Sequence, residues 1–134
     1  MPVANNAHTA SQRDFLEAGG FGEILGNDVS KLQKAIEPCK RVLAAARSCG
    51  MMVIHTREGH RPDMSDVHPL KNEKKDRNGN MVKLIGESGP MGRILIRGEP
   101  GHDIISELYP QKGEPIIDKP GEERNCILPD AFCL

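Results

Sequence analysis

An apolar stripe followed by a short apolar run constrains the fold of this 134-residue chain more than any other feature. Gly50 closes the stripe, and the uninterrupted apolar run Met51–Ile54 follows it. Such a run is typical of a strand that is buried on both faces, as in a parallel sheet. A helix that leads into a buried strand predicts an α/β fold. The stripe recurs every three or four positions, as one face of a helix does, and consists of Val29, Leu32, Ile36, Cys39, Val42, Leu43 and Ala46.

The ends and the middle of this helical segment carry their own signals. Ser30, with Gln33 three residues later, predicts a capping box at the start of the helix. Pro38 interrupts the stripe and has two interpretations: it kinks one helix, or it begins a second helix at its first position.

The remaining segments carry weaker patterns. Residues 1–26 have no apolar period and are predicted to form a loop. The short apolar segments Ile94–Ile96 and Ile116–Ile117 predict an edge strand and a second strand, respectively, and His102–Leu108 predicts a short helical turn. Residues 57–90 are polar, and their length predicts an active-site lid, an arm that contacts a partner, or disorder. Within them, Lys71–Arg77 mixes both charge signs and is interpreted as solvated surface.

Composition excludes several classes of protein. Apolar residues make up 37% and aromatic residues 3%, which predicts a thin core. A net charge of −1 argues against nucleic acid or anionic lipid as a partner. No apolar run is long enough for a membrane helix, and residues 1–10 do not resemble a signal peptide, so a cytoplasmic protein is expected.

The cysteines and histidines give no clear metal signal. Cys39, Cys49, Cys126 and Cys133 lack C-x-x-C spacing, so we expect reduced thiols, no zinc site and no cofactor. His55 and His60 are spaced for a metal only on a helix, whereas they follow a predicted strand. The isolated histidines are expected at the surface or in loops; these are His8, His68 and His102.

Lys119 is the most informative single residue. It follows an apolar strand directly, and α/β proteins bind ligands at the carboxyl edge of the sheet. There it can donate to an oxyanion or lower the pKa of a thiol, unless it is an ordinary solvent-facing lysine. The other charged residues in loop surroundings are interpreted as solvated; these are Asp14, Arg57, Glu58, Arg61, Arg97 and Glu99.

Six blocks in order resemble the isochorismatase-like cysteine hydrolases, and most closely the branch of ureidoacrylate and biuret amidohydrolases. The blocks are Gln12–Glu17, Gly19–Gly22, Val53–His60, Gly89–Gly92, Arg97–Ile104 and Ile116–Gly121. The resemblance implies a Rossmann-like parallel sheet with helices on both faces. It also implies a Cys-Asp-Lys triad, in which the thiolate attacks an amide-like carbonyl, the lysine stabilises charge and the aspartate moves the proton.

Only one member of that triad is matched. Lys119 corresponds to the family lysine, but Ala10 stands where the family aspartate is expected, and Asp14 matches a later aspartate of the same motif. Cys126 and Cys133 precede the place of the nucleophile, because a helix and a strand that should come before it are absent. The resemblance therefore implies a chain that is inactive alone.

The mismatches define the expected organisation: a divergent segment 1–11, a partial isochorismatase-like domain 12–121 and a divergent tail 122–134. The first strand and the C-terminal half are expected to be missing, as altered splicing would produce.

Arg57, His60 and Arg61 follow the end of a strand and are the expected contacts of a small amide or ureido substrate. Alternatively, the chain is a truncated non-catalytic subunit that joins a full-length paralogue or its own copies, or a product that does not fold well.

Overall fold

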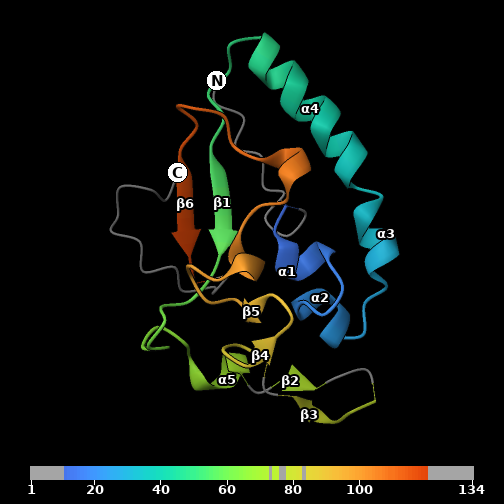
Figure 1. Cartoon of the computed structure of the whole chain (residues 1–134), viewed down its shortest axis with the longest axis vertical. Coiled ribbons are helices and arrows are strands. Elements are labelled where there is room, and N and C mark those ends of the chain that lie inside the picture. Colours follow the sequence, from blue (N-terminus) through green and yellow to red (C-terminus); the bar gives the residue numbers. More distant parts are fainter. Residues whose placement is uncertain (1–10, 73, 76–77, 83, 121–134) are drawn as a thin grey trace.

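The computed structural model describes residues 11–72, 74–75, 78–82 and 84–120 (Figure 1). Its larger helices are α3 (Val29–Gln33) and α4 (Ile36–Ser48), and its longer strands are β1 (His55–Glu58) and β6 (Ile116–Lys119). The shorter elements are α1 (Arg13–Leu16), α2 (Phe21–Ile24), α5 (Pro69–Asn72), β2 (Lys74–Lys75), β3 (Met81–Val82), β4 (Ser88–Gly89), β5 (Gly92–Arg93) and the 3₁₀ turns η1 (Pro100–His102) and η2 (Ser106–Leu108). In the described part of the chain, no helix is long and apolar enough to cross a membrane.

The longer strands, β1 and β6, are far apart in the sequence but form a parallel pair, which lies on the left in Figure 1. Their register places His55 opposite Ile116 and Glu58 opposite Lys119. Two antiparallel pairs, β2 with β3 and β4 with β5, complete the described strands. The presence of helices together with a parallel strand pair confirms the predicted α/β fold, and the arrangement is consistent with an incomplete Rossmann-like domain.

The predicted helical segment is confirmed, but Leu32 and Val42 of its apolar stripe are exposed, and two further details differ. The break falls between α3 and α4, and Pro38 is the third residue of α4, where its missing N–H removes no helical hydrogen bond. The cap is Asp28, whose carboxylate accepts from the Ser30 N–H at 3.1 Å, so the predicted capping box at Ser30 is wrong. Gln33 instead donates to the Leu16 carbonyl at 2.7 Å.

The first strand was predicted four residues too early. Met51–Ile54 precede β1, and the side chain of Met52 is 68% exposed. Pairing begins where the His55 N–H donates to the Pro115 carbonyl at 2.8 Å. The position of β1 is therefore set by where β6 begins, whereas the apolar run has no partner strand among the described residues.

Two other segments differ from their predictions. Ile94–Ile96 are buried but form a turn, in which Leu95 has a φ of +53°, a value that a strand residue does not adopt. Residues 13–24 contain α1 and α2 rather than loop. Residues 57–90 contain the short elements from α5 to β4, and their role as a lid or a partner-contacting arm stays a prediction. The short helical turn predicted at 102–108 resolves into η1 and η2.

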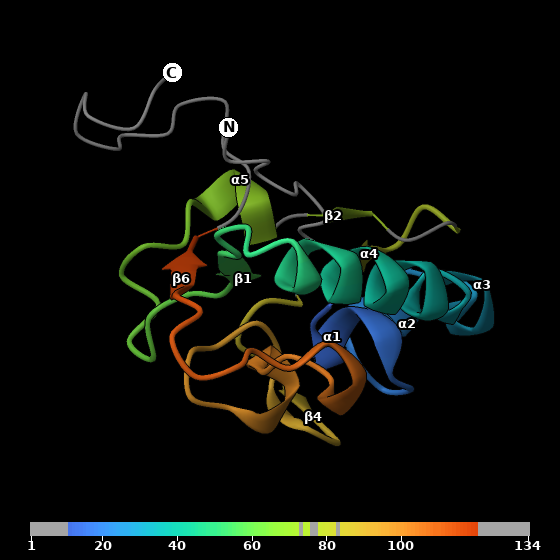
Figure 2. The same ribbon diagram turned by 90° about the horizontal axis from the view of Figure 1, so that it is seen from above.

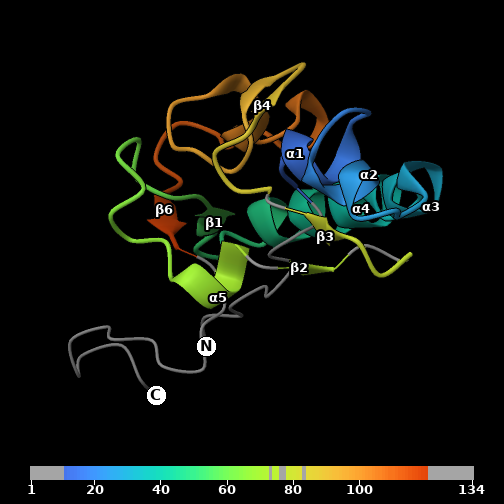
Figure 3. The same cartoon turned by 90° about the horizontal axis from the view of Figure 1, so that it is seen from below.

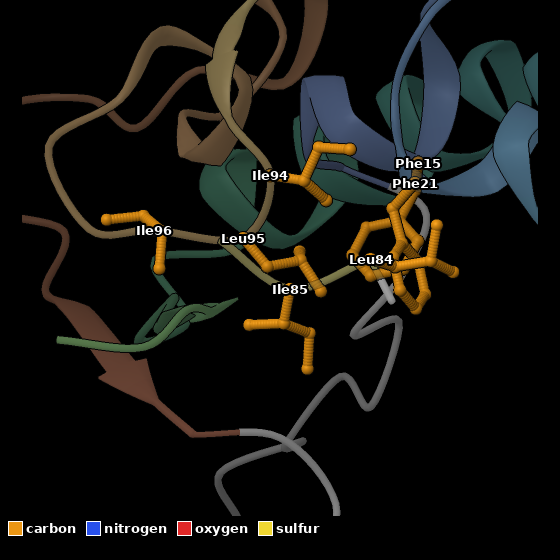
Figure 4. Packing of buried hydrophobic residues seen from close by; sticks show 7 residues of the cluster. All are labelled: Phe15, Phe21, Leu84, Ile85, Ile94, Leu95 and Ile96. Carbon is orange, nitrogen blue, oxygen red and sulfur yellow. The ribbon is translucent and has the colours of Figure 1, made fainter. Parts of the chain in front are cut away.

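Two apolar clusters form the core. The first brings together residues from α1, α2, the segment between β3 and β4, and the turn after β5 (Figure 4); its buried members are Phe15, Phe21, Leu84, Ile85, Ile94, Leu95 and Ile96. The second joins Leu16 to Ile104, Ile105 and Leu108, and α4 covers it. Both clusters are small, as the low apolar content predicted.

Candidate active site

The carboxyl ends of β1 and β6 meet at one edge of the parallel pair, and α5 lies beside that edge (Figure 2, Figure 3). Strand residues alternate between the two faces, so Arg57 shares one face with Asp118, and Glu58 shares the other with Lys119. Ligands in α/β proteins bind at such an edge. The charged groups here therefore form the candidate site.

On one face, Arg57 is held by two carboxylates. Its Nε donates to Asp118 Oδ1 at 2.7 Å and its Nη2 to Asp118 Oδ2 at 3.1 Å, while Nη1 donates to Asp103 Oδ1 at 2.9 Å. Burial alone would lower the pKa of Arg57, but the hydrogen bonds and charges of Asp118 and Asp103 outweigh it and raise the pKa. Arg57 thus joins the strand pair to η1 and is not simply solvated.

His102 of η1 is buried beneath the same face, so its predicted surface position is wrong. Its Nε2 lies 3.5 Å from Asp118 Oδ1 and has no hydrogen-bond partner among the described residues. Burial, and then the charge of Arg57, lowers the pKa of His102. Gly59 permits this position, because a Cβ at residue 59 would collide with the imidazole.

On the opposite face, Lys71 reaches the edge from α5. Its Nζ lies 2.9 Å from Glu58 Oε1 and 3.1 Å from His60 Nε2, and it donates to the Pro120 carbonyl. Only 15% of the Lys71 side chain is exposed. The interpretation of residues 71–77 as solvated surface is therefore wrong for Lys71.

His60 is fully buried at the start of the segment that leads to α5. Its Nδ1 lies 3.3 Å from Asp66 Oδ1, and its backbone pairs with residues on either side of Ile96. Burial, and then the positive charge of Lys71, lowers the pKa of His60. A neutral ring with its proton on Nδ1 donates to Asp66 and accepts from Lys71 at Nε2.

Lys119 ends β6 at the centre of this edge and is half-buried. Its carbonyl accepts from the Gly59 N–H at 2.8 Å, which fixes its backbone against β1. Among the residues that the structure describes, no ion pair or hydrogen bond engages its ammonium, although the charged groups around it are paired. The geometry makes Lys119 an available cation at the edge.

The three expected substrate contacts lie in different surroundings. Arg57 lies on the Asp118 face, whereas His60 contacts Lys71 on the Glu58 face. Arg61 is exposed, and its backbone N–H donates to Asp66 Oδ1 at 3.0 Å. Their role toward a substrate stays a prediction.

Two buried polar residues near the edge were missed. The Gln12 amide donates to the Glu58 carbonyl at 2.8 Å and accepts from the Glu58 N–H at 2.7 Å, as a neighbouring strand would. Asp14, interpreted as solvated, is buried, and its Oδ2 accepts from the Leu95 N–H at 2.8 Å. Burial raises the pKa of Asp14. The available signal was the closeness of both residues to Phe15 and Leu16 in a short apolar segment.

The remaining residues that the sequence analysis singled out fall into two groups. His8, Ala10, Cys126 and Cys133 are outside the described residues. Cys39 packs from α4 against the second apolar cluster and Cys49 follows α4; both are free thiols. Within the described ranges, no group of three His, Cys, Asp or Glu side chains could hold a metal ion.

Comparison with known proteins decides the family, because the family model described as the isochorismatase domain matches residues 11–122. The chain belongs to the isochorismatase family. It is 28% identical over 109 residues to the ureidoacrylate amidohydrolase RutB of Yersinia enterocolitica, a match that covers 81% of this chain and 47% of that protein. The RutB proteins of Serratia proteamaculans and Caulobacter segnis are each 27% identical, again over 81% of this chain, with 44% and 45% of their own lengths covered. This family member thus spans about half the length of the curated relatives that it matches.

Proposed function

We propose that this chain carries part of the pocket of a hydrolase that acts on the C–N bond of a small amide or ureido compound. The observation that supports this most directly is Lys119, a cation without a partner among the described residues at the carboxyl edge of the parallel pair. Similarity to proteins named ureidoacrylate amidohydrolase gives the substrate class.

In this proposal, Lys119 stabilises the negative charge that develops on the carbonyl oxygen when a thiolate attacks the carbonyl carbon. Arg61 is exposed and is the proposed substrate contact beside the edge. Arg57 is held by Asp118 and Asp103 on the other face, and His60 is fully buried, so in this proposal both shape the edge from behind and do not contact the substrate. Ala10 occupies the place of the family aspartate, and neither Cys126 nor Cys133 matches the nucleophile. We therefore expect this chain to bind the substrate without turning it over, because a triad that lacks two members keeps little of its rate.

The test separates binding from turnover. Ureidoacrylate or biuret is added to the purified chain, and amide spectra report binding while loss of substrate reports hydrolysis. We expect shifts near Lys119 that disappear in Lys119→Met, with no hydrolysis. Absence of binding would refute the proposal, and hydrolysis that is lost in Lys119→Ala would refute the expected inactivity.

A second candidate function is that of a non-catalytic subunit that associates with a full-length paralogue. It is supported by apolar side chains exposed on and before the parallel pair, namely Met51, Met52, Ile54, Ile116 and Ile117. Exposed apolar patches of this kind mark interaction surfaces. Co-purification with a full-length family member, lost in a Met52→Lys/Ile117→Lys variant, would support this function. A monomer with no affinity for that protein would exclude it.

A further inference from the structure

The register of the parallel pair sets Glu58 directly opposite Lys119. Opposed residues of adjacent strands point to the same face, and the strands lie about 4.8 Å apart. A carboxylate and an ammonium in these positions are within reach of each other, and such a pair would be favourable. On register alone, Glu58 and Lys119 should form an ion pair.

The structure gives Glu58 a different partner. Its Oε1 lies 2.9 Å from Nζ of Lys71, and the Glu58 and Lys71 side chains are only 17% and 15% exposed. The other two donors of the Lys71 ammonium are directed to His60 Nε2, at 3.1 Å, and to the Pro120 carbonyl. All three protons of Lys71 are thereby used.

The position of Lys71 does not depend on these contacts alone. The next residue, Asn72, anchors α5 to the core: its Oδ1 accepts from the Leu84 N–H at 3.3 Å and from the Ile85 N–H at 3.0 Å. α5 is therefore held on one side by the core backbone and on the other by the sheet edge. A shortened side chain at position 71 should leave α5 in place.

The protonation of His60 fits this arrangement. Burial and the charge of Lys71 lower its pKa, which keeps the ring neutral and leaves Nε2 free to accept. Asp66 faces the other ring nitrogen, and its second oxygen lies 3.6 Å from Nη2 of Arg97. Asp66 is thus paired with His60 and Arg97, and the carboxylate that pairs with Lys71 is that of Glu58.

We propose that Lys71 is a positioning residue, which holds the Glu58 carboxylate away from Lys119 and so keeps the Lys119 ammonium available to the substrate. Through the Pro120 carbonyl it also fixes the turn that follows Lys119. The consequence for catalysis rests on the proposed function of Lys119. Whether the Glu58 carboxylate pairs with Lys71 or with Lys119 can be measured without any substrate.

The experiment measures how fast the Lys119 amine is acetylated by a pulse of acetic anhydride, by mass spectrometry of the peptide that contains it, at about pH 9, below the ordinary lysine pKa of about 10.4. Without Lys71, the Glu58 carboxylate is expected to pair with the Lys119 ammonium, which leaves less of the neutral amine that reacts with the anhydride. The Lys71→Met variant should therefore acetylate Lys119 about twofold to fivefold more slowly, the range expected for a partly exposed ion pair. Lys71→Arg keeps a cation on Glu58 and should preserve the wild-type rate.

A double-mutant cycle removes the general effect of changing a nearby charge. Glu58→Gln should accelerate acetylation of Lys119 clearly more in the Lys71→Met background than in the wild type. Amide spectra confirm that each variant is folded. An equal effect of Glu58→Gln in both backgrounds would overturn the proposal. If the wild-type chain does not bind the substrate but Glu58→Gln still accelerates acetylation more in the Lys71→Met background, only the proposed function is refuted.

Discussion

At the scale of single residues, Gly59, which directly follows β1, lies against His102 of η1. A Cβ there would overlap the buried His102 ring. We expect Gly59→Ala to lower the free energy of unfolding by about 1–3 kcal/mol, because the ring cannot move without disturbing the packing around it. Urea denaturation measures this cost.

The control for Gly59 is a variant that removes the ring. In His102→Ala the space is vacated, so the Gly59→Ala/His102→Ala double variant should lose less stability than the sum of the two single variants. Additive losses would show that the cost at Gly59 has another origin than contact with His102.

Single buried polar groups were the hardest feature to predict. Lys119 was singled out because it lies at the end of a predicted strand and matches the family lysine, and its role stays a prediction. His60 and His102 are buried by segments distant in the sequence, and nothing beside them differs from an ordinary loop. Lys71 lies in a run of mixed charge, which by itself indicates solvated surface. Its burial results from pairing with Glu58, thirteen residues earlier, and no local pattern encodes that pairing.

At the scale of elements, α4 attaches to the core by one narrow stripe. Leu43 packs against the cluster of Leu16 and Ile104, whereas its neighbour Val42 is 55% exposed. Leu43→Ala should lower the free energy of unfolding by about 1–3 kcal/mol, because it removes packed methyl groups. Val42→Ala is the matched control and should change it by less than about 0.5 kcal/mol. Thermal or urea unfolding with equal costs at both positions would contradict this orientation of α4.

A second link ties α4 to the strands through Glu114. Arg47 donates to the two Glu114 oxygens at 2.6 and 2.7 Å, and His55 Nε2 lies 2.8 Å from Oε2. The hydrogen bonds from Arg47, more than any other contact, lower the pKa of Glu114 to about 2.

The pH dependence of this link follows from the direction of the shift. A depressed carboxyl pKa stabilises the fold above the unfolded value of about 4.3, and this stabilisation is lost as the pH falls through about 2. Glu114→Gln should cost about 1–2 kcal/mol at neutral pH and little at the acid end of that window. Denaturant titrations at several pH values test this, and a cost that does not change with pH would contradict it.

Elements with a local cause were predicted, and elements with a distant cause were misplaced. The period of three and four along α3 and α4 resides in the sequence itself, so both helices were found. β1 begins at His55 because Pro115 and Ile116 lie opposite it, and the apolar run Met51–Ile54 gave no information on that register. At Ile94–Ile96, apolar character indicated burial correctly, but the positive φ of Leu95 makes a turn.

At the scale of the whole molecule, two buried neutral histidines should make the fold sensitive to mild acid. Burial lowers the pKa of both His60 and His102, with further contributions from Lys71 and Arg57. Below the unfolded pKa of about 6.5, the unfolded chain takes up protons that the folded chain does not, so stability falls with the pH. Each histidine contributes at most about 1.4 kcal/mol per pH unit.

This acid sensitivity can be assigned to the two rings by comparing slopes rather than stabilities. Between about pH 6.5 and about pH 5.5, the free energy of unfolding should fall by about 1–2 kcal/mol in the wild type and by about half as much in His60→Gln or His102→Gln. Because the slope depends only on the difference in bound protons, it is informative even where a variant lowers the overall stability. A slope equal in all three proteins would mean that neither buried ring is neutral in the folded chain, and the donation from Lys71 to His60 would then be wrong as well.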